Sequence, residues 1–276
     1  MENKQLQFNS PTFYQRIKGM LSVDFYRLFH TPMFYIFLAI AAIIPAMVLG
    51  MTSMETAEGI SKPLYTNTWQ MVAANKPLYA VSSIAEYANM NMVFIFGGIM
   101  ISIFIGHDYR SGYVKQLFTT HPKKEDYMMS KSVIGAFSMA CMCITYLIGT
   151  IISGLLVGAS FKVSVGSLLI AILGKILMSA GWASLYTFLN IIFRKFFAIS
   201  ILSSFFFGTG IIIIGLGAMV GNGNASILNV LLYGSSVNAC LSSNILSLLT
   251  CLVVSVAWAV IYNVLGTHIL SKTDVY

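Results

Sequence analysis

Six long apolar stretches, each long enough to cross a membrane as a helix, constrain the fold more than any other feature of this sequence. A spanning helix needs about 20 mainly apolar residues. Only 9% of the 276 residues are charged, against about 25% in soluble domains, so most of the surface must face lipid. We therefore expect an all-α polytopic membrane protein that forms one transmembrane domain. The six predicted transmembrane helices lie at about residues 33–50, 89–105, 133–158, 165–193, 196–220 and 245–270.

Lysine and arginine residues lie mainly on one side of the predicted spans. If the N-terminus is cytoplasmic, the outer segments hold only Lys62, Lys76 and Lys162. Because positive residues are enriched in cytoplasmic loops, we expect both termini inside the cell. The localisation that we expect is a bacterial cell (plasma) membrane, in which the protein is multi-pass. The inner segments then hold Lys4, Arg16, Lys18, Arg27, Arg110, Lys115, Lys123, Lys124, Lys131, Arg194, Lys195 and Lys272.

A short amphipathic elbow helix is predicted ahead of the first span, over about residues 13–30. Its apolar residues recur every three or four positions, at Tyr14, Ile17, Leu21, Phe25 and Leu28. The charged residues Arg16, Asp24 and Arg27 are assigned to its other faces. Such a helix either lies along the inner membrane surface or packs as a soluble helix on a partner.

The last outer segment, residues 221–244, contains no charged residue. Its apolar run is too short to span, which predicts an extracellular hairpin of re-entrant or interfacial type.

The segment 107–131, between the second and third spans, is the only charge-dense stretch of the chain. An acidic residue stands at the membrane exit, a glycine follows four residues later, and an amphipathic helical turn comes next. We interpret this segment as a short cytoplasmic helix across the foot of two spans. Because both of its ends are fixed to rigid elements, such a helix can pass a partner's motion to the spans. The plainer interpretation is an ordinary solvated loop that carries inward-facing positive charge.

This arrangement resembles the ABC-2 type permease family. Members commonly show an acid-x-x-x-Gly pattern after the second span, then a short helix, a proline, basic residues and a lysine that enters the third span. The matching residues here are Asp108, Gly112, Pro122, Lys123 and Lys131. The predicted topology agrees over essentially the whole chain. The sequence departs from the usual pattern in having Asp108 for Glu and Tyr113 for Thr.

The resemblance implies the permease subunit of an ATP-driven ABC exporter, which is a transport subunit and not itself an enzyme. Two copies of this permease would work with two copies of a separate ABC ATPase subunit, which would bind the ATP and Mg. The sequence contains no Gly-x-x-x-x-Gly-Lys-Ser/Thr phosphate loop of its own. The residues to which the resemblance assigns coupling are Asp108, Arg110, Gly112, Tyr113, Val114, Leu117, Phe118, Pro122 and Lys123.

Lys175 is the one ionisable side chain well inside a predicted span. An intramembrane charge is costly unless it is paired, hydrated or able to reach the interface. Lys175 either lines a water-filled cargo path, where it meets an anionic group, or snorkels to the outer surface. Asn190 and Asn263 are further candidates for the cargo path, although such residues more often form hydrogen bonds between helices.

Several other functions find little support in the sequence. No Ser/His/Asp set, metalloprotease helix or zinc-type cysteine spacing is present, and we expect no disulfide among Cys141, Cys143, Cys240 and Cys251. The sequence also lacks a stripe of basic residues interleaved with aromatic residues, which is the pattern that would indicate nucleic-acid binding. An ion-coupled carrier is the main alternative, although all nine acidic residues lie outside the predicted spans. A membrane scaffold or sensor is a third hypothesis for the function.

The cargo is predicted from the character of the spans and from the resemblance. The apolar, largely uncharged spans suit amphipathic or hydrophobic cargo. Family members of this size often export antimicrobial or toxic peptides or give immunity to them, so outward peptide transport is the first choice. Drugs, lipids or sodium are the alternatives for an exporter.

Overall fold

The computed structural model describes residues 11–54, 68–72, 90–120, 123–157, 161, 165–209, 230–241 and 245–272. Helices account for 91% of these residues, and no strand occurs among them. The predicted all-α class is therefore confirmed. The elements are α1 (Phe13–His30), α2 (Pro32–Met54), the 3₁₀ turn η1 (Thr68–Met71), α4 (Met92–Arg110), α5 (Tyr113–Thr120), α6 (Lys124–Val157), α7 (Val165–Ile192), α8 (Phe197–Gly208), α11 (Leu232–Leu241) and α12 (Ile245–Lys272).

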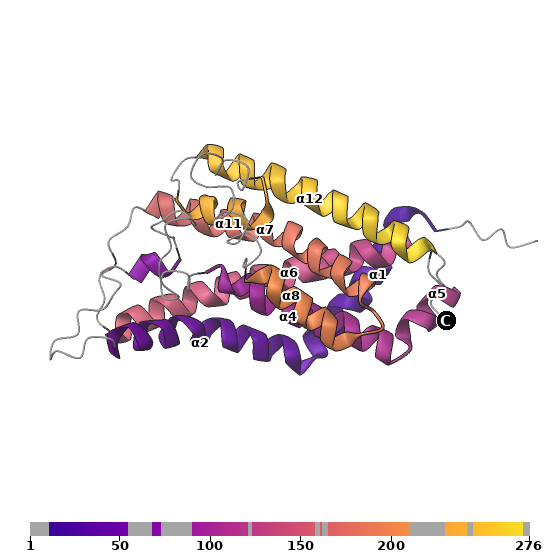
Figure 1. Cartoon of the computed structure of the whole chain (residues 1–276), viewed down its shortest axis with the longest axis horizontal. Helices are drawn as coiled ribbons and strands as arrows, with labels where there is room; N and C mark the ends of the chain where they lie inside the picture. The colour runs from indigo at the N-terminus through magenta and orange to yellow at the C-terminus, as the bar shows by residue number, and fades with distance from the viewer. Residues whose placement is uncertain are drawn as a thin grey trace, which may run out of the picture.

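The long helices lie alongside one another in an elongated bundle (Figure 1). Four of the described helices, α4, α6, α7 and α12, are long and apolar enough to cross a membrane. A fifth results if α1 and α2, which meet at a bend of 65°, form one broken span. The described residues thus supply four to five apolar helices that could span a membrane, and the count of six remains a prediction.

The two predicted segments before α12 lie to a large part outside the described residues. The predicted span 196–220 is represented by α8, an apolar helix of 12 residues, and the remainder beyond residue 209 is not described. The predicted hairpin 221–244 is represented by residues 230–241, which include α11.

Helix α7 lies at the centre of the bundle and packs against α12, α6, α11 and α4. Its aromatic side chains form part of the core, where the ring of Trp182 stacks on Phe94 at 5.4 Å and on Tyr186 at 5.6 Å between centroids. Helix α2 packs on α6 at Gly149, where any side chain would overlap the backbone of Ala42. Close packing through small residues is typical of helices in lipid.

The outside of the bundle is apolar. Along α12, Leu249, Val253, Val256 and Val264 are each more than half exposed. Contiguous exposed apolar surface of this kind is unusual on a soluble monomer. The described helices therefore have the surface expected for contact with lipid.

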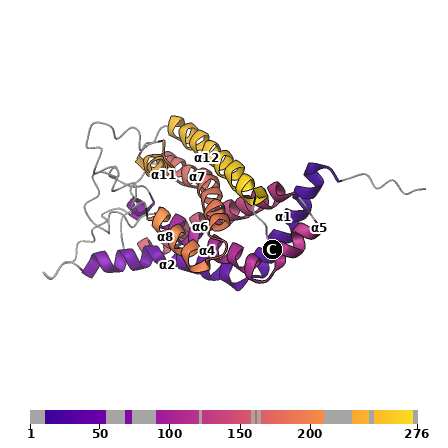
Figure 2. The same cartoon turned by 45° about the vertical axis from the view of Figure 1, so that its right-hand side comes forward.

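Three elements meet at one end of the bundle. In both views α1, α5 and the C-terminal end of α12 lie together, whereas α11 and the start of α12 lie at the opposite end (Figure 1, Figure 2). Helix α1 begins with a capping box, in which the Thr12 side chain accepts from the Gln15 amide and Gln15 accepts from the Thr12 amide. It ends at Thr31, because the residue before Pro32 is driven out of the helical conformation.

The face that α1 buries differs in two respects from the predicted stripe. Leu28 is buried, but Tyr14 is 72% exposed and Asp24 is fully buried. The assignment of Asp24 to an outer polar face was therefore wrong. A buried carboxylate requires partners, and they define the site described next.

Candidate functional site

The segment between α4 and α6 forms a short, tightly packed helix. α4 ends at Arg110, and the chain turns through Gly112, whose φ of +74° lies in the left-handed region that glycine adopts without strain. α5 then packs its apolar face onto the bundle: Val114 is only 1% exposed and Leu117 and Phe118 are half-buried. Their neighbours from four other helices are Met20, Tyr127, Met128, Ile191 and Leu270.

The opposite face of α5 is polar and exposed. It carries Lys115, Gln116 and Thr119. The apolar residues that the sequence assigned to coupling thus attach α5 to its own chain, and a partner that docked here would meet the polar face. Lys123 is exposed next to this helix, and Pro122 lies outside the described residues.

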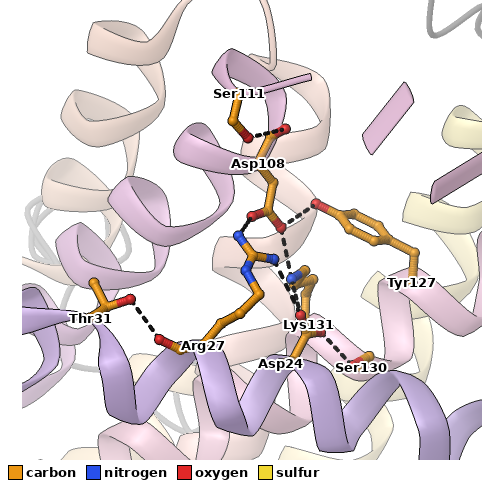
Figure 3. Close-up of polar contacts among 8 residues, drawn as sticks. All are labelled: Asp24, Arg27, Thr31, Asp108, Ser111, Tyr127, Ser130 and Lys131. Carbon is orange, nitrogen blue, oxygen red and sulfur yellow. Dashed lines mark hydrogen bonds and ion pairs between the residues drawn. The ribbon is translucent and has the colours of Figure 1, made fainter. Parts of the chain in front are cut away.

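Beneath α5, a buried ion-pair cluster joins α1, α4 and α6 (Figure 3). The Lys131 ammonium lies between two carboxylates, 2.6 Å from Asp24 Oδ1 and 2.7 Å from Asp108 Oδ2. Asp24 and Asp108 are fully buried and Lys131 is 1% exposed. Each of the three residues comes from a different helix, so the cluster fixes those helices to one another.

Arg27 supplies the second positive charge. Its guanidinium donates to Asp108 Oδ1 and lies 3.6 Å from Asp24 Oδ1. The same group lies over the ring of Tyr113, the first residue of α5, at 4.3 Å from its centroid. Burial tends to lower the pKa of Arg27, but the hydrogen bond and the charge of Asp108, with the charge of Asp24, raise that pKa above its ordinary value. Arg27 therefore stays charged.

Hydroxyl groups complete the coordination of the two carboxylates. Ser130 Oγ donates to Asp24 Oδ2 at 2.7 Å, and Tyr127 Oη lies 3.4 Å from Asp108 Oδ2. Two negative charges thus face two positive charges, with every carboxylate oxygen bonded. Removing charges from water costs several kcal/mol per ion, which only such complete pairing offsets. The cluster acts as a structural junction in which each carboxylate oxygen already accepts at least one hydrogen bond or ion pair.

Sequence reasoning named Asp108 and Lys131 but missed Asp24 and Arg27 as their partners. A signal was present: Asp24 lies three residues after Leu21 and four before Leu28, which places it on the buried face of the helix. An acidic residue at such a position indicates an ionic partner.

Further polar contacts tie the same end of the bundle together. Arg16 Nε donates to Asp126 Oδ2 at 2.7 Å, which links α1 to α6. Lys124 Nζ donates to the Leu270 carbonyl at 2.8 Å, which links α6 to α12. The Arg110 guanidinium lies 4.1 Å from the centroid of the Phe197 ring on α8. These contacts join α1 to α6, α6 to α12 and α4 to α8 at the end of the bundle that carries α5.

Lys175 lies in a different environment, towards the other end of the bundle. It is fully buried and donates to Asn91 Oδ1 and, at 2.7 Å, to the Ser236 carbonyl. The Phe94 ring lies 5.7 Å away. The ammonium group is enclosed within this chain, and its place in a cargo path stays a prediction. No carboxylate among the described residues contacts it.

The two candidate asparagines form hydrogen bonds between helices. Asn190 is 2% exposed and donates to Ser102 Oγ at 3.0 Å, which joins α7 to α4. Asn263 donates to Ser184 Oγ at 3.1 Å and accepts from Ser132 Oγ at 3.1 Å, which joins α12 to α7 and α6. The structure therefore brings neither residue to Lys175 or to the cluster beneath α5.

Comparison of the sequence with models of known protein families and with curated proteins gives no match. The class that the fold defines is a helical protein with four to five apolar helices able to span a membrane.

Proposed function

We propose that this chain is the permease subunit of an ATP-driven ABC exporter of the ABC-2 type that it resembles. In this proposal two copies of the chain work with two copies of a separate ATPase subunit that binds ATP and Mg. The chain crosses the cell membrane six times with both termini in the cytoplasm. The cargo is amphipathic or hydrophobic, with peptides as the first choice.

The observation that carries the proposal is the mounting of α5. It is held at both ends by long apolar helices, α4 and α6. Its apolar face is buried against the bundle, and Tyr113 at its start contacts Arg27 of the ion-pair cluster. Its polar face is exposed. A force on that face is transmitted to α1, α4 and α6 together, because the buried ion pairs fix these helices to one another.

In the proposed mechanism this junction transmits motion from α5 to the bundle. Closure of the ATPase subunits around ATP pushes the exposed face of α5. The inner ends of α1, α4 and α6 then move as one unit, and the bundle switches from an inward-open to an outward-open state. Packed helical bundles favour such discrete states over continuous deformation. ATP binding shifts the population between the two states to the extent that it favours one.

The test is co-purification of an ATPase. The tagged full-length chain would be purified from its native host in mild detergent, and the soluble proteins that accompany it identified and assayed for ATP hydrolysis. We expect an ATPase with a phosphate loop. The double variant Lys115→Glu/Gln116→Glu should lose at least about tenfold of the recovered ATPase, corresponding to about 1.4 kcal/mol of binding, with unchanged thermal stability.

Lys272→Glu is the matched control, because Lys272 is also an exposed lysine at the end of a helix that reaches the same end of the bundle. It should retain the ATPase. Purification of the chain alone under several gentle conditions would contradict the proposal, as would full ATPase recovery with the α5 double variant. A positive result leads to a screen for peptides that stimulate ATP hydrolysis.

A further inference from the structure

The bend between α1 and α2 leaves a cavity of about 300 Å³ against the inner part of α4. Ligand-binding pockets have volumes of roughly 300–1,000 Å³, so this cavity is large enough for part of a small amphiphile. Most of its wall is apolar and comes from all three helices. The apolar lining residues are Leu28, Met33, Phe34, Met100, Ile103 and Phe104.

Basic and polar side chains also line the cavity. Arg27, His30 and His107 line it, together with Thr31 at the bend. The His30 ring is fixed in place, because it stacks on Tyr26 at 3.9 Å and its Nδ1 lies 2.8 Å from the Tyr26 carbonyl. An apolar pocket with a basic rim is complementary to a molecule that has a hydrocarbon chain and an anionic head.

Arg27 has one donor that no hydrogen bond among the described residues uses. Its Nη1 is buried with no hydrogen-bond partner among the described residues, since Asp24 Oδ1 is 3.6 Å away. Buried donors are nearly always paired. Guanidinium groups bind phosphate oxygens more tightly than most other donors because the bonds are charge-assisted.

The surroundings of the cavity indicate that its occupant comes from the bilayer. Tyr26 and Tyr35, on the two sides of the bend, are 64% and 54% exposed, and Phe29 between them is 43% exposed. Tyrosine is enriched where a membrane protein passes from hydrocarbon to head groups. The bend lies at the end of the bundle that carries α5, which the charge distribution assigns to the cytoplasmic side.

We propose that this cavity binds an anionic phospholipid of the cytoplasmic leaflet. One acyl chain enters the apolar pocket, and the phosphate lies against Arg27, His30 and His107. The site goes beyond the exporter function and does not depend on it. Because Arg27 also bonds Asp108, a lipid bound here contacts the junction that holds α1 to α4.

The test is native mass spectrometry of the purified full-length chain, titrated with dioleoyl phosphatidylglycerol or with dioleoyl phosphatidylcholine. The two lipids share their acyl chains, so a difference reports the head group. We expect one phosphatidylglycerol molecule to bind at least about fivefold more tightly than phosphatidylcholine, as one contacted basic residue near the surface would give.

Two variants locate the site. Ile103→Trp fills the cavity, and His107→Glu places a negative charge at its rim on an exposed residue; each should weaken phosphatidylglycerol binding by about fivefold or more. Val256→Trp, on the exposed face of α12, is the matched control for Ile103→Trp and should leave binding unchanged.

Equal binding of the two lipids by the wild type would overturn the anionic preference. Unchanged binding by His107→Glu would overturn the site, and this variant decides the matter if Ile103→Trp does not fold. The measurement involves no ATPase, so its failure is distinct from failure of the proposed exporter function.

Discussion

Among the residues that the structure describes, buried positive charge occurs in two places. The two places differ in the groups that bind the positive charge. At the inner end, Lys131 and Arg27 face the carboxylates of Asp24 and Asp108. Towards the other end, Lys175 is bonded, among the residues that the structure describes, to the neutral oxygens of Asn91 and Ser236. Asn91 and Asp108 stand at the two ends of α4, about 25 Å apart at 1.5 Å per residue. Helix α4 thus contacts the ion-paired Lys131 near one end and, near the other end, Lys175, which is bonded to neutral oxygens.

The difference between the partners of Lys131 and those of Lys175 indicates which helix contacts are fixed and which can rearrange. A balanced ionic cluster has strong directional bonds and is expensive to open, because opening leaves buried charges alone. When the partners of Lys175 move, fewer charges are separated, because its two hydrogen bonds are to neutral oxygens. We infer that α1, α4 and α6 stay together at the inner end, whereas the contact of α7 with α4 and α11 near Lys175 rearranges more readily.

The largest effect is expected from Lys131→Met, which breaks the paired region. The substitution leaves two buried carboxylates with only Arg27 between them, and should destabilise the fold by about 3–5 kcal/mol. The measurement is unfolding of the purified chain in mixed micelles with increasing SDS. Lys123→Met, at an exposed position, is the matched control and should stay within about 0.5 kcal/mol of wild type. A Lys131→Met protein as stable as the control would contradict the assignment of a buried junction.

Asp108→Asn should have the next largest effect, about 2–3 kcal/mol. The asparagine oxygen still accepts a hydrogen bond, and Arg27 has 23% of its side chain exposed, so water relieves part of the excess positive charge. The same SDS titration measures it. Combining Asp108→Asn with Lys131→Met should cost less than the sum of the two single changes, with a coupling of about 1–3 kcal/mol. Strict additivity would show that the two residues act independently.

Lys175→Met is expected to cost about 1 kcal/mol, well below Lys131→Met, although both lysines are fully or almost fully buried. The substitution loses two hydrogen bonds but also removes an unpaired charge from the interior, and these terms oppose each other. Both methionine variants would be compared in one unfolding series. A loss at position 175 equal to that at position 131 would mean that Lys175 has a charged partner in the assembled protein.

The sequence predicted the elements better than the contacts. The apolar stripe predicted a helix over about 13–30, and α1 spans Phe13–His30. The span at 165–193 corresponds to α7 at Val165–Ile192. α6, however, begins at Lys124, nine residues before the predicted span at 133. Hydropathy detects the part of a helix that suits lipid, and the polar first turns of α6 stand outside that part.

The candidate site was predicted in part, for a physical reason. Helical spacing places Asp24 on the buried face, but it does not show that Lys131, 107 positions later, comes within 2.6 Å of it. Nor does it show that the apolar face of α5 is used within the chain. Such pairings depend on how helices from distant parts of the sequence pack, and a periodicity argument concerns one helix at a time.

The smallest effect is expected at a third polar cluster, which carries no charge and lies inside the bundle. Ser102 and Ser204 share a hydrogen bond of 2.8 Å between α4 and α8, and Asn190 of α7 donates to Ser102. Hydrogen bonds between helices in membrane proteins contribute about 0.6 kcal/mol on average. We therefore expect a coupling of about that size in a Ser102→Ala/Ser204→Ala double-mutant cycle, measured by the same unfolding titration.

Ser203→Ala is the control for this cycle, because Ser203 donates only to the Ser200 carbonyl of its own helix. Combined with Ser102→Ala it should show no coupling. A Ser102–Ser204 coupling above about 2 kcal/mol, as large as that expected within the ionic cluster, would contradict the ranking. Neutral polar contacts would then fix the bundle as firmly as buried ion pairs, and the contrast between Lys131 and Lys175 would no longer identify the adaptable region.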